Sequence, residues 1–470
     1  MRKTRIVTTI GPATESEEML EKLVNSGVNV FRLNSSHDTI EIHRERIRRL
    51  KKIREKLNTP FSILIDLSGP KIRTGKLKEE YITLKEGSIL KITTEDLLGD
   101  ESILSVNYKR FPLEVKSGDR ILLNDGAIEL TVEKVEDNLV YTKVIRGGKI
   151  THHRGVNLPG VDLSISAVTD KDKKFIDLAI EEDLDYIALS FVRKASDVKY
   201  AKSLSNGIPV IAKIETAQAL DNLEEIISFA DGVMVARGDL GVEIPLSQVP
   251  IAQKRIIETA NRMSKPVITA TQMLESMINN MTPTRAEVSD IANAILDGTD
   301  AIMLSSETSI GKYPLRAVAV MDEVAKNTEK FLLDYDSIEL EWIRNYYISE
   351  NIEDAISHAV YNLSRDINAK LIITATSTGK TAINIARLRP SVPIMAATPN
   401  LSTYYRLSLV WGVIPVMINQ TLSTDEMIIE VMRKAKETNL ASKGDKVIIT
   451  AGIPWGRPGT TNTLQVHEII

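Results

Sequence analysis

Residues 209–216 read PVIAKIET, an apolar run that ends on a lysine and a glutamate two positions apart. Side chains alternate between the two faces of a β-strand, so a strand here would place Lys213 and Glu215 on one face and Ile214 on the other. Burying either charge alone would cost several kcal/mol, so each needs the other, a metal or a ligand. For this pattern alone a structural ion pair is the better interpretation, and only the ends of the other strands can favour a functional site.

Seven other short β-branched runs, each bounded by Gly, Pro or polar residues, predict further strands. Segments with helical periodicity separate most of them. Strands that are apolar on both faces and alternate with helices indicate a parallel sheet, and eight such units indicate a closed (β/α)8 barrel. The expected strands begin at residues 4, 28, 61, 186, 209, 232, 265 and 301, and the expected helices cover residues 15–25, 39–57, 197–205, 217–228, 247–263, 284–296 and 314–331.

Two regions depart from this rhythm. Between the third and fourth expected strands, alternating runs such as YITLKEGSILKIT and several glycine-containing turns predict an antiparallel β domain inserted into a barrel loop. Because barrel active sites lie at the C-terminal strand ends, this domain would cover the site as a lid. After residue 331 a new alternation of helices and strands predicts a smaller open α/β domain. The expected division is 1–70 and 164–340 for the barrel, 71–163 for the lid and 341–470 for the C-terminal domain.

The composition excludes several kinds of site and partner. The 470 residues include no cysteine, which excludes disulfides, thiolate metal sites and a cysteine nucleophile. A net charge of -4 gives no general attraction to nucleic acid or anionic membranes. No apolar run reaches the ~20 residues of a membrane helix, and the N-terminus does not fit a signal peptide, so a cytoplasmic protein is expected. No role is expected for His43, His358 and His467, on helix or edge surfaces, or for His152 and His153, on the lid.

Polar and charged residues gather at the C-terminal ends of six expected strands, the face of such a barrel that carries chemistry. Glu215 and Asp239 offer hard oxygen ligands, which in the absence of cysteine or a histidine pair suit Mg²⁺ or Mn²⁺ better than zinc. Arg32, Arg73 and Lys213 would converge on phosphoryl oxygens, and a metal with a cationic clamp is what phosphoryl transfer requires. The gathered residues are Arg32, Asn34, Ser36, His37, Asp66, Ser68, Lys71, Arg73, Lys213, Glu215, Arg237, Gly238, Asp239, Thr269, Thr271, Ser305, Ser306 and Glu307.

Long and specific motifs are distributed along the whole chain: TIGPAT, FRLNSSH, GPKIRTG, GVNLPG, IPVIAKIETAQAL, VMVARGDLG, KPVITATQMLESM and MLSSETSIGKYP. In sequence and in order they are similar to those of the pyruvate kinase family. The resemblance implies transfer of the phosphoryl group of phosphoenolpyruvate to ADP in glycolysis, giving pyruvate and ATP. It also implies a homotetramer whose subunits have a barrel, a β lid and a C-terminal regulatory domain.

The same resemblance implies a role for each rim residue. Lys213 would stabilise the transferring phosphoryl group and the enolate oxygen, with Glu215 and Asp239 holding the divalent metal. Thr271 would help to protonate the enolate. The substrate would be bound by Arg32 at its phosphate and by Gly238, Asp239 and Thr271 at its carboxylate. The nucleotide would face Asn34, His37, Arg73 and Arg154, and a monovalent cation would contact Asn34, Ser36, Asp66 and the Leu67 carbonyl.

Two positions depart from the commoner pattern of the family. Lys71 stands where potassium-dependent members carry an acid, and the usual Thr-Lys pair after the aspartate is Leu67-Ser68 here. At an effective dielectric near 20, a unit charge about 4 Å away is worth roughly 4 kcal/mol, so an ammonium in place of an acid could replace a monovalent cation. The alternative is that Lys71 points into solvent and K⁺ binds as usual. The sequence favours a protein that does not require K⁺.

A hydroxyl-rich loop in the C-terminal region, TSTGKT from Thr376, predicts an anion nest at a helix N-terminus. It does not fit a Walker A loop, because the first glycine of that motif would fall on Thr374. A plain helix cap is the alternative. A later loop brings Arg457, and the resemblance implies that both loops bind a phosphorylated effector. The expected effector residues are Thr376, Ser377, Thr378, Gly379, Thr381 and Arg457.

Two other functions compete with phosphoryl transfer. A barrel lyase acting on phosphoenolpyruvate or pyruvate could also use a carboxylate-bound metal, but it would leave the lid and the second set of cations unexplained. A non-catalytic metabolite sensor with a vestigial barrel would not need intact Lys213, Glu215, Asp239 and Thr271.

Overall fold

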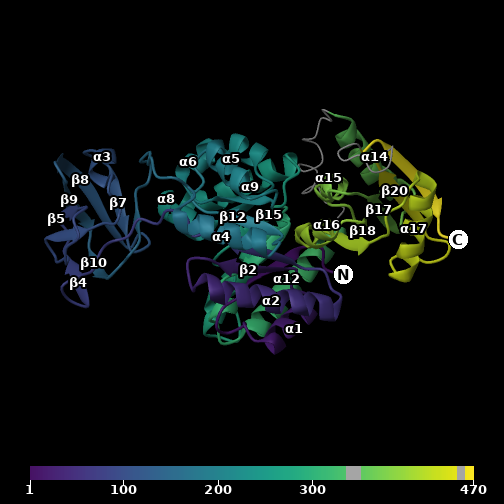
Figure 1. Cartoon of the computed structure of the whole chain (residues 1–470), viewed down its shortest axis with the longest axis horizontal. Helices are drawn as coiled ribbons and strands as arrows, with labels where there is room; N and C mark the ends of the chain where they lie inside the picture. Colours follow the sequence, from purple (N-terminus) through teal and green to yellow (C-terminus); the bar gives the residue numbers. More distant parts are fainter. Residues whose placement is uncertain (335–350, 453–460) are drawn as a thin grey trace.

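The computed structural model describes residues 1–334, 351–452 and 461–470. Within these ranges the chain forms a lid, a barrel and a C-terminal domain, which lie in a row with the barrel in the middle (Figure 1). The division expected between residues 340 and 341 lies outside the described residues. A search of the described helices finds none with the length and apolarity needed to cross a membrane.

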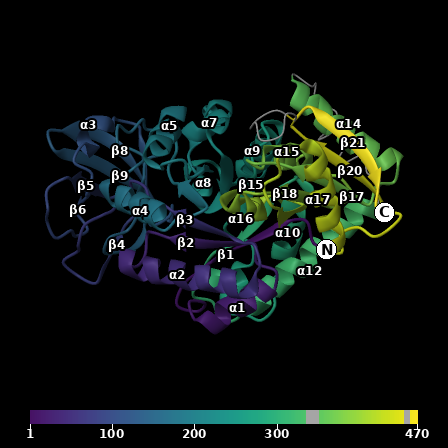
Figure 2. The same ribbon diagram turned by 45° about the vertical axis from the view of Figure 1, so that its right-hand side comes forward.

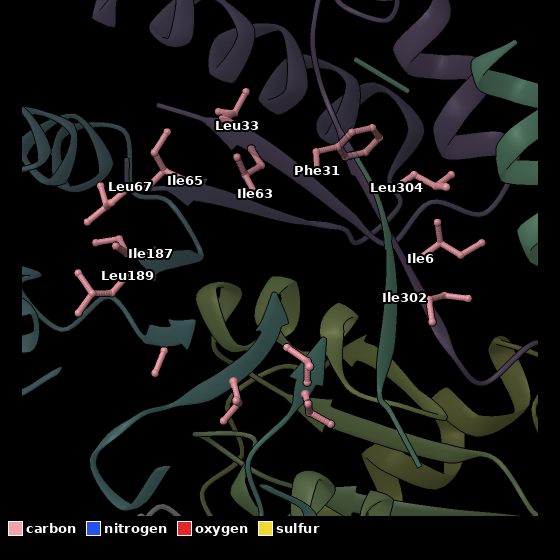
Figure 3. Close-up of a cluster of buried hydrophobic side chains, with 14 of the residues drawn as sticks. Ile6, Phe31, Leu33, Ile63, Ile65, Leu67, Ile187, Leu189, Ile302 and Leu304 are labelled. Carbon is pink, nitrogen blue, oxygen red and sulfur yellow. The ribbon is translucent and has the colours of Figure 1, made fainter. Parts of the chain in front are cut away.

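The barrel consists of parallel strands that close on themselves, because β1 pairs with both β2 and β16. All eight predicted strands form, in the spatial order β1-β16-β15-β14-β13-β12-β3-β2. Their outward side chains form one large buried cluster with the surrounding helices, and Figure 3 shows part of it, including Ile6, Phe31 and Ile63. The strands are β1 (Arg5–Thr9), β2 (Val30–Asn34), β3 (Ser62–Asp66), β12 (Tyr186–Leu189), β13 (Val210–Ile214), β14 (Gly232–Ala236), β15 (Val267–Ala270) and β16 (Ala301–Leu304).

The helices that surround the barrel differ from the sequence prediction in several places, since the short helices α8 and α11 that follow β14 and β16 were not predicted. α4 was not predicted, although Thr169 and Asp172 form a capping box at its N-terminus. The helix predicted over 217–228 is broken at Asn222, whose side chain donates to the Arg193 carbonyl at 2.9 Å. The helices are α1 (Glu17–Asn25), α2 (Ile40–Leu57), α4 (Asp170–Glu181), α5 (Ala195–Leu204), α6 (Ala217–Asp221), α7 (Leu223–Phe229), α8 (Arg237–Glu243), α9 (Val249–Arg262), α10 (Arg285–Leu296), α11 (Ser306–Ser309) and α12 (Pro314–Asp334), with 3-10 turns η1 (Leu246–Gln248) and η2 (Glu275–Ile278).

The lid is the expected antiparallel β domain, with one parallel pair, β5 and β6. It has its own core, which includes the fully buried Phe111, Ile121 and Leu130. Its elements are β4 (Tyr81–Leu84), β5 (Ile89–Thr93), β6 (Ile103–Ser105), α3 (Phe111–Glu114), β7 (Arg120–Leu123), β8 (Ile128–Glu136), β9 (Leu139–Arg146), β10 (Gly148–Thr151) and β11 (Val156–Asn157).

The C-terminal domain is the expected open α/β sheet, in the order β19-β18-β17-β20-β21, with β21 as an antiparallel edge strand. Its helix α16 lies against the barrel in both views (Figures 1 and 2). Leu409 enters the core inside the barrel, and the Ser62 hydroxyl donates to the Tyr405 carbonyl at 2.7 Å. The domain therefore docks at the N-terminal strand ends, opposite the predicted site. Its elements are α14 (Ile352–Asp366), β17 (Leu371–Ala375), α15 (Lys380–Ala386), β18 (Ile394–Thr398), α16 (Leu401–Arg406), η4 (Leu407–Leu409), β19 (Val413–Met417), α17 (Thr424–Glu437), β20 (Lys446–Ala451) and β21 (Thr463–Glu468).

Candidate active site

Lys213 is a buried residue near the C-terminal end of barrel strand β13. Ile211 belongs to the core inside the barrel, whereas Ala212 and Ile214 belong to the outer core, so Lys213 points inward. Its Nζ lies 2.7 Å from Glu215 Oε1, which confirms that the two side chains share one face. The strand itself ends at Ile214, so Glu215 is held by the loop that follows.

A second pair of charges completes this cluster. Lys213 Nζ lies 3.2 Å from Asp66 Oδ1, and Arg32 Nε donates to Asp66 Oδ2 at 2.7 Å. The four side chains of Arg32, Asp66, Lys213 and Glu215 are all buried. Two cations and two anions therefore compensate one another, and the half-buried Asp239 adds a further negative charge nearby.

The pKa shifts follow from this charge pattern. Burial alone would lower the pKa of Lys213, but the carboxylates of Asp66, Glu215 and Asp239 outweigh it and raise that pKa. Burial would raise the pKa of Asp66, but Lys213 and Arg32 hold it below its ordinary value. Burial, opposed by Lys213 and assisted by Asp239, raises the pKa of Glu215. The raised pKa favours the ammonium form of Lys213, which suits a cation that stabilises negative charge rather than a base.

Glu215 and Asp239 fit a hard divalent cation. Glu215 Oε2 accepts the Phe191 N–H at 2.7 Å, whereas the buried Oε1 accepts no well-directed hydrogen bond from any described residue and has the Lys213 ammonium beside it. No group of three His, Cys, Asp or Glu in the described ranges could hold a metal. A cation on two carboxylates would take its other ligands from water or substrate, as Mg²⁺ commonly does.

The end of β15 is strained. Thr271 has φ of 68° and Gln272 has φ of 56°, and such a conformation in a β-branched residue costs on the order of 1–3 kcal/mol. The Thr271 hydroxyl donates to the Ala270 carbonyl at 2.6 Å and accepts the Gly238 N–H at 2.9 Å. Arg237 donates to the Thr271 carbonyl at 2.5 Å, which makes it a support for this turn. To accept a hydrogen bond from the Gly238 N–H, a substrate carboxylate would have to take the place of the Thr271 hydroxyl, which accepts it here.

Of the predicted nucleotide residues, Arg73 and Arg154 lie at the base of the lid, whereas Asn34 and His37 lie at the end of β2 and just after it. The structure brings Arg32 and Lys213 together but places Arg73 in a separate cavity, which Ser36, Lys71 and Lys171 also line. Arg73 donates from Nη1 to the His153 carbonyl at 3.1 Å, and Arg154 donates from Nε to the Thr151 hydroxyl at 2.6 Å. Both arginines and His37 are exposed, so they remain accessible to a ligand.

The four groups expected around a monovalent cation lie at the paired ends of β2 and β3, where Asn34 is opposite Asp66, and three of them already have hydrogen-bond donors. Asn34 Oδ1 accepts the Ser36 N–H at 3.1 Å, Asp66 Oδ2 accepts from Arg32, and the Leu67 carbonyl accepts the Ser190 hydroxyl at 2.7 Å. Lys71 is exposed at the edge of the site.

Comparison with known proteins decides the family. The family model described as "Pyruvate kinase, barrel domain" matches residues 1–318, and that described as "Pyruvate kinase, alpha/beta domain" matches residues 354–467. The chain belongs to the pyruvate kinase family. It is 52% identical over 473 residues to the pyruvate kinase of Thermotoga maritima and 42% identical over 475 residues to that of Clostridium acetobutylicum, with 100% of both chains covered in each case. A crystal structure of a pyruvate kinase from Cryptosporidium parvum has a TM-score of 0.93 at 36% identity and covers 100% of this chain and 96% of that chain.

The effector residues predicted by the resemblance to pyruvate kinases lie around the N-terminus of α15. The Thr376 hydroxyl accepts the Gly379 N–H at 2.9 Å, and Thr381 and Thr461 share a hydrogen bond of 2.5 Å between their hydroxyls. The Thr376 hydroxyl thus satisfies a backbone N–H at the start of α15, and Thr461, the first residue of the stretch 461–470, contacts α15 through Thr381. Ser377 and Thr378 lie in the same loop, and Arg457 falls outside the described residues.

The structure of this pyruvate kinase family member also identifies residues near the site that the sequence analysis did not predict. Ser190 follows β12 and accepts from Lys213 Nζ at 2.7 Å, and the strand-end rule would have found it had the fourth strand been included. Burial raises the pKa of Glu243 to about 7, with the charges of Asp239 and Glu215 adding to the effect. The prediction that His43 lies on a surface is wrong, because it occupies the inner face of α2 and bonds through Nε2 to the His37 carbonyl at 2.9 Å.

Proposed function

We propose that this chain transfers the phosphoryl group of phosphoenolpyruvate to ADP at the cluster formed by Arg32, Asp66, Lys213, Glu215 and Asp239. The bond between phosphorus and the enol oxygen breaks, a bond to an oxygen of the ADP β-phosphate forms, and the enolate left behind takes up a proton to give pyruvate. The observation that carries the proposal is the buried Lys213 side chain, held between the carboxylates of Asp66 and Glu215 with the negative charge of Asp239 nearby.

Lys213 and Arg32 would stabilise the negative charge of the transferring group. Both cations are fixed by Asp66, so their orientation costs little reorganisation when the charge develops. Lys213 would also stabilise the enolate oxygen, and the Thr271 hydroxyl would help to protonate the enolate. The backbone of Gly238 and Asp239, with Thr271, would hold the substrate carboxylate.

Glu215 and Asp239 would hold Mg²⁺ or Mn²⁺. When bound, the metal would neutralise phosphoryl oxygens and help to align them with the nucleophile. Two carboxylates leave coordination positions for substrate oxygens, which suits a cation shared between protein and substrate.

The nucleotide would occupy the cavity at the base of the lid, with Asn34, His37, Arg73 and Arg154 facing it. Lys171 lines the same cavity and adds a further cation. Because Arg73 and Arg154 lie on the lid and Lys213 on the barrel, closure of the lid would bring the two substrates together and exclude water.

Potassium is not required in this proposal. Three of the four groups that would bind the ion already accept hydrogen bonds, and Asp66 is neutralised by Arg32 and Lys213. Lys71 adds positive charge at the rim of the site. The wild type should keep nearly full activity when tetramethylammonium replaces K⁺ at constant ionic strength, whereas Lys71→Glu should acquire a K⁺ requirement. A many-fold stimulation of the wild type by K⁺ would contradict this.

Family membership also supports a cytoplasmic homotetramer whose C-terminal domain binds a phosphorylated effector at Thr376, Ser377, Thr378, Gly379, Thr381 and Arg457. The main proposal is tested by coupling pyruvate formation to lactate dehydrogenase and omitting one component at a time. Pyruvate should form only when phosphoenolpyruvate, ADP and Mg²⁺ or Mn²⁺ are all present. Pyruvate formation without ADP would indicate a lyase or phosphatase instead.

A further inference from the structure

The segment that returns from the lid to the barrel is held by side chains of the barrel. Arg193 donates from Nη1 to the Leu163 carbonyl at 2.6 Å and from Nη2 to the Ile165 carbonyl. Gln218 donates from Nε2 to the Val161 carbonyl at 3.2 Å. Three alternate carbonyls of this segment are thus bound to the barrel, two of them by a single guanidinium.

The outgoing segment is held in a complementary way. The fully buried Asp172 accepts through Oδ1 the N–H groups of Ser68 at 3.0 Å and Gly69 at 3.3 Å. Gly69 has φ of 64°, and a Cβ there would lie 2.9 Å from a ring carbon of Phe191. The outgoing segment is therefore fixed through its N–H groups by the Asp172 carboxylate, and the return segment is fixed through its carbonyls by the Arg193 guanidinium.

The loop that carries Arg193 also contacts the catalytic cluster. The Ser190 hydroxyl accepts from Lys213 Nζ and donates to the Leu67 carbonyl, each at 2.7 Å. The Phe191 N–H donates to Glu215 Oε2 at 2.7 Å. The backbone of Arg193 is anchored in turn, since its N–H donates to Asp197 Oδ2 at 3.0 Å. Residues 190–193 thus join both lid connections to Lys213 and Glu215.

We propose that Arg193 is a positioning residue that sets the orientation of the lid relative to Lys213 and Glu215, a role that rests on the phosphoryl transfer proposed above. Without its guanidinium the return segment keeps the Gln218 contact but loses both contacts to Arg193, while Asp172 still holds the outgoing segment, so the lid turns more freely relative to the barrel. The fraction of molecules in which Arg73 of the lid and Lys171 of the barrel line one cavity then falls. The apparent affinity for the nucleotide falls by the same factor, whereas phosphoenolpyruvate on the barrel keeps its contacts.

The test combines kinetics with a distance measurement across the lid. The chain has no cysteine, so Lys143→Cys on β9 and Glu225→Cys on α7, both exposed, give a unique pair of spin-label sites. Arg193→Met should broaden the distance distribution with Mg²⁺ and ADP bound. It should raise KM for ADP about tenfold, the scale of losing a charge-assisted hydrogen-bond pair, and leave KM for phosphoenolpyruvate within about twofold.

Lys194→Met is the matched control, because it removes the neighbouring exposed cation and should match the wild type in all three readouts. Arg193→Lys should give a distance distribution and a KM for ADP between those of the wild type and Arg193→Met, since its ammonium keeps the charge but not the two-pronged geometry of the guanidinium. A folded Arg193→Met protein with a wild-type distance distribution, or with both KM values raised equally, would overturn the proposal. If Arg193→Met does not fold, Gln218→Leu replaces it in the test. This variant should broaden the distance distribution and raise KM for ADP, both by less than is expected for Arg193→Met. A Gln218→Leu protein that matches the wild type in both readouts would also overturn the proposal. The distance measurement needs no turnover, so an inactive wild type would refute the proposed function and not the role of Arg193.

Discussion

Replacing Lys213 by methionine removes the ammonium and keeps most of the apolar length of the side chain. Lys213 Nζ lies 2.7 Å from Glu215 Oε1 and 3.2 Å from Asp66 Oδ1, and all three side chains are buried. A unit charge at about 4 Å and an effective dielectric near 20 contributes roughly 4 kcal/mol. We expect the barrier to phosphoryl transfer to rise by about 3 kcal/mol or more, which lowers kcat by at least about a hundredfold.

The same substitution should change how stability depends on pH. Asp66 keeps Arg32, but Glu215 loses its cation, so its pKa, already raised by burial, should rise further in the metal-free protein. A carboxyl group whose pKa is higher in the folded than in the unfolded state contributes stability that is complete below its unfolded pKa. That stability is lost as the pH rises through the folded pKa. Lys213→Met should therefore lose thermal stability towards neutral pH.

Lys213→Arg separates charge compensation from catalysis. It keeps a cation beside Glu215 and Asp66, so its stability should follow the wild-type pH profile, while its altered geometry should still lower kcat. Coupled assays at saturating Mg²⁺ and substrates, with thermal unfolding from about pH 4 to 8, give both quantities. Turnover of Lys213→Met within tenfold of the wild type would refute the catalytic role and leave Lys213 as a structural partner of the two carboxylates.

Two further predictions concern the neighbouring carboxylates. Glu215→Gln should weaken metal affinity, so raised Mg²⁺ or Mn²⁺ should restore part of the activity; a metal-concentration profile identical to that of the wild type would contradict the assignment of Glu215 as a ligand. Burial raises the pKa of Glu243 to about 7, so in the metal-free wild type its contribution to stability should be lost as the pH rises from about 4.5 through 7. Glu243→Gln should flatten this part of the profile, and unfolding temperatures that keep the wild-type slope would argue against the shift.

The barrel could be predicted because each strand is marked by a pattern of residues that are adjacent in the sequence. In β13 every residue is buried, with Ile211 inside the barrel and Ala212 outside, and the sequence shows this as an unbroken apolar run. The shared face of Lys213 and Glu215 follows from strand geometry in the same way. Their partner Asp66 was expected at the same rim, but as part of a cation pocket and not as the counter-ion of Lys213 and Arg32.

What the sequence did not predict depends on contacts between distant residues. The break between α6 and α7 coincides with the bond from the Asn222 side chain to the Arg193 carbonyl, 29 residues away in the chain. The placement of Arg73 in a cavity apart from Lys213 depends on how the lid is oriented, which no local pattern encodes. His43 was expected on a helix surface, yet the helical period puts it on the same buried face as Ile47 and Leu50.

The fate of the phosphoryl group tests the central claim most directly. Phosphoenolpyruvate labelled with ³²P, incubated with the wild type, ADP and Mg²⁺, should deliver its label to ATP in a one-to-one ratio with the pyruvate formed, and Lys213→Met should show neither product on the same time scale. Label released as inorganic phosphate while pyruvate accumulates, or pyruvate formed without ATP, would contradict phosphoryl transfer at this site.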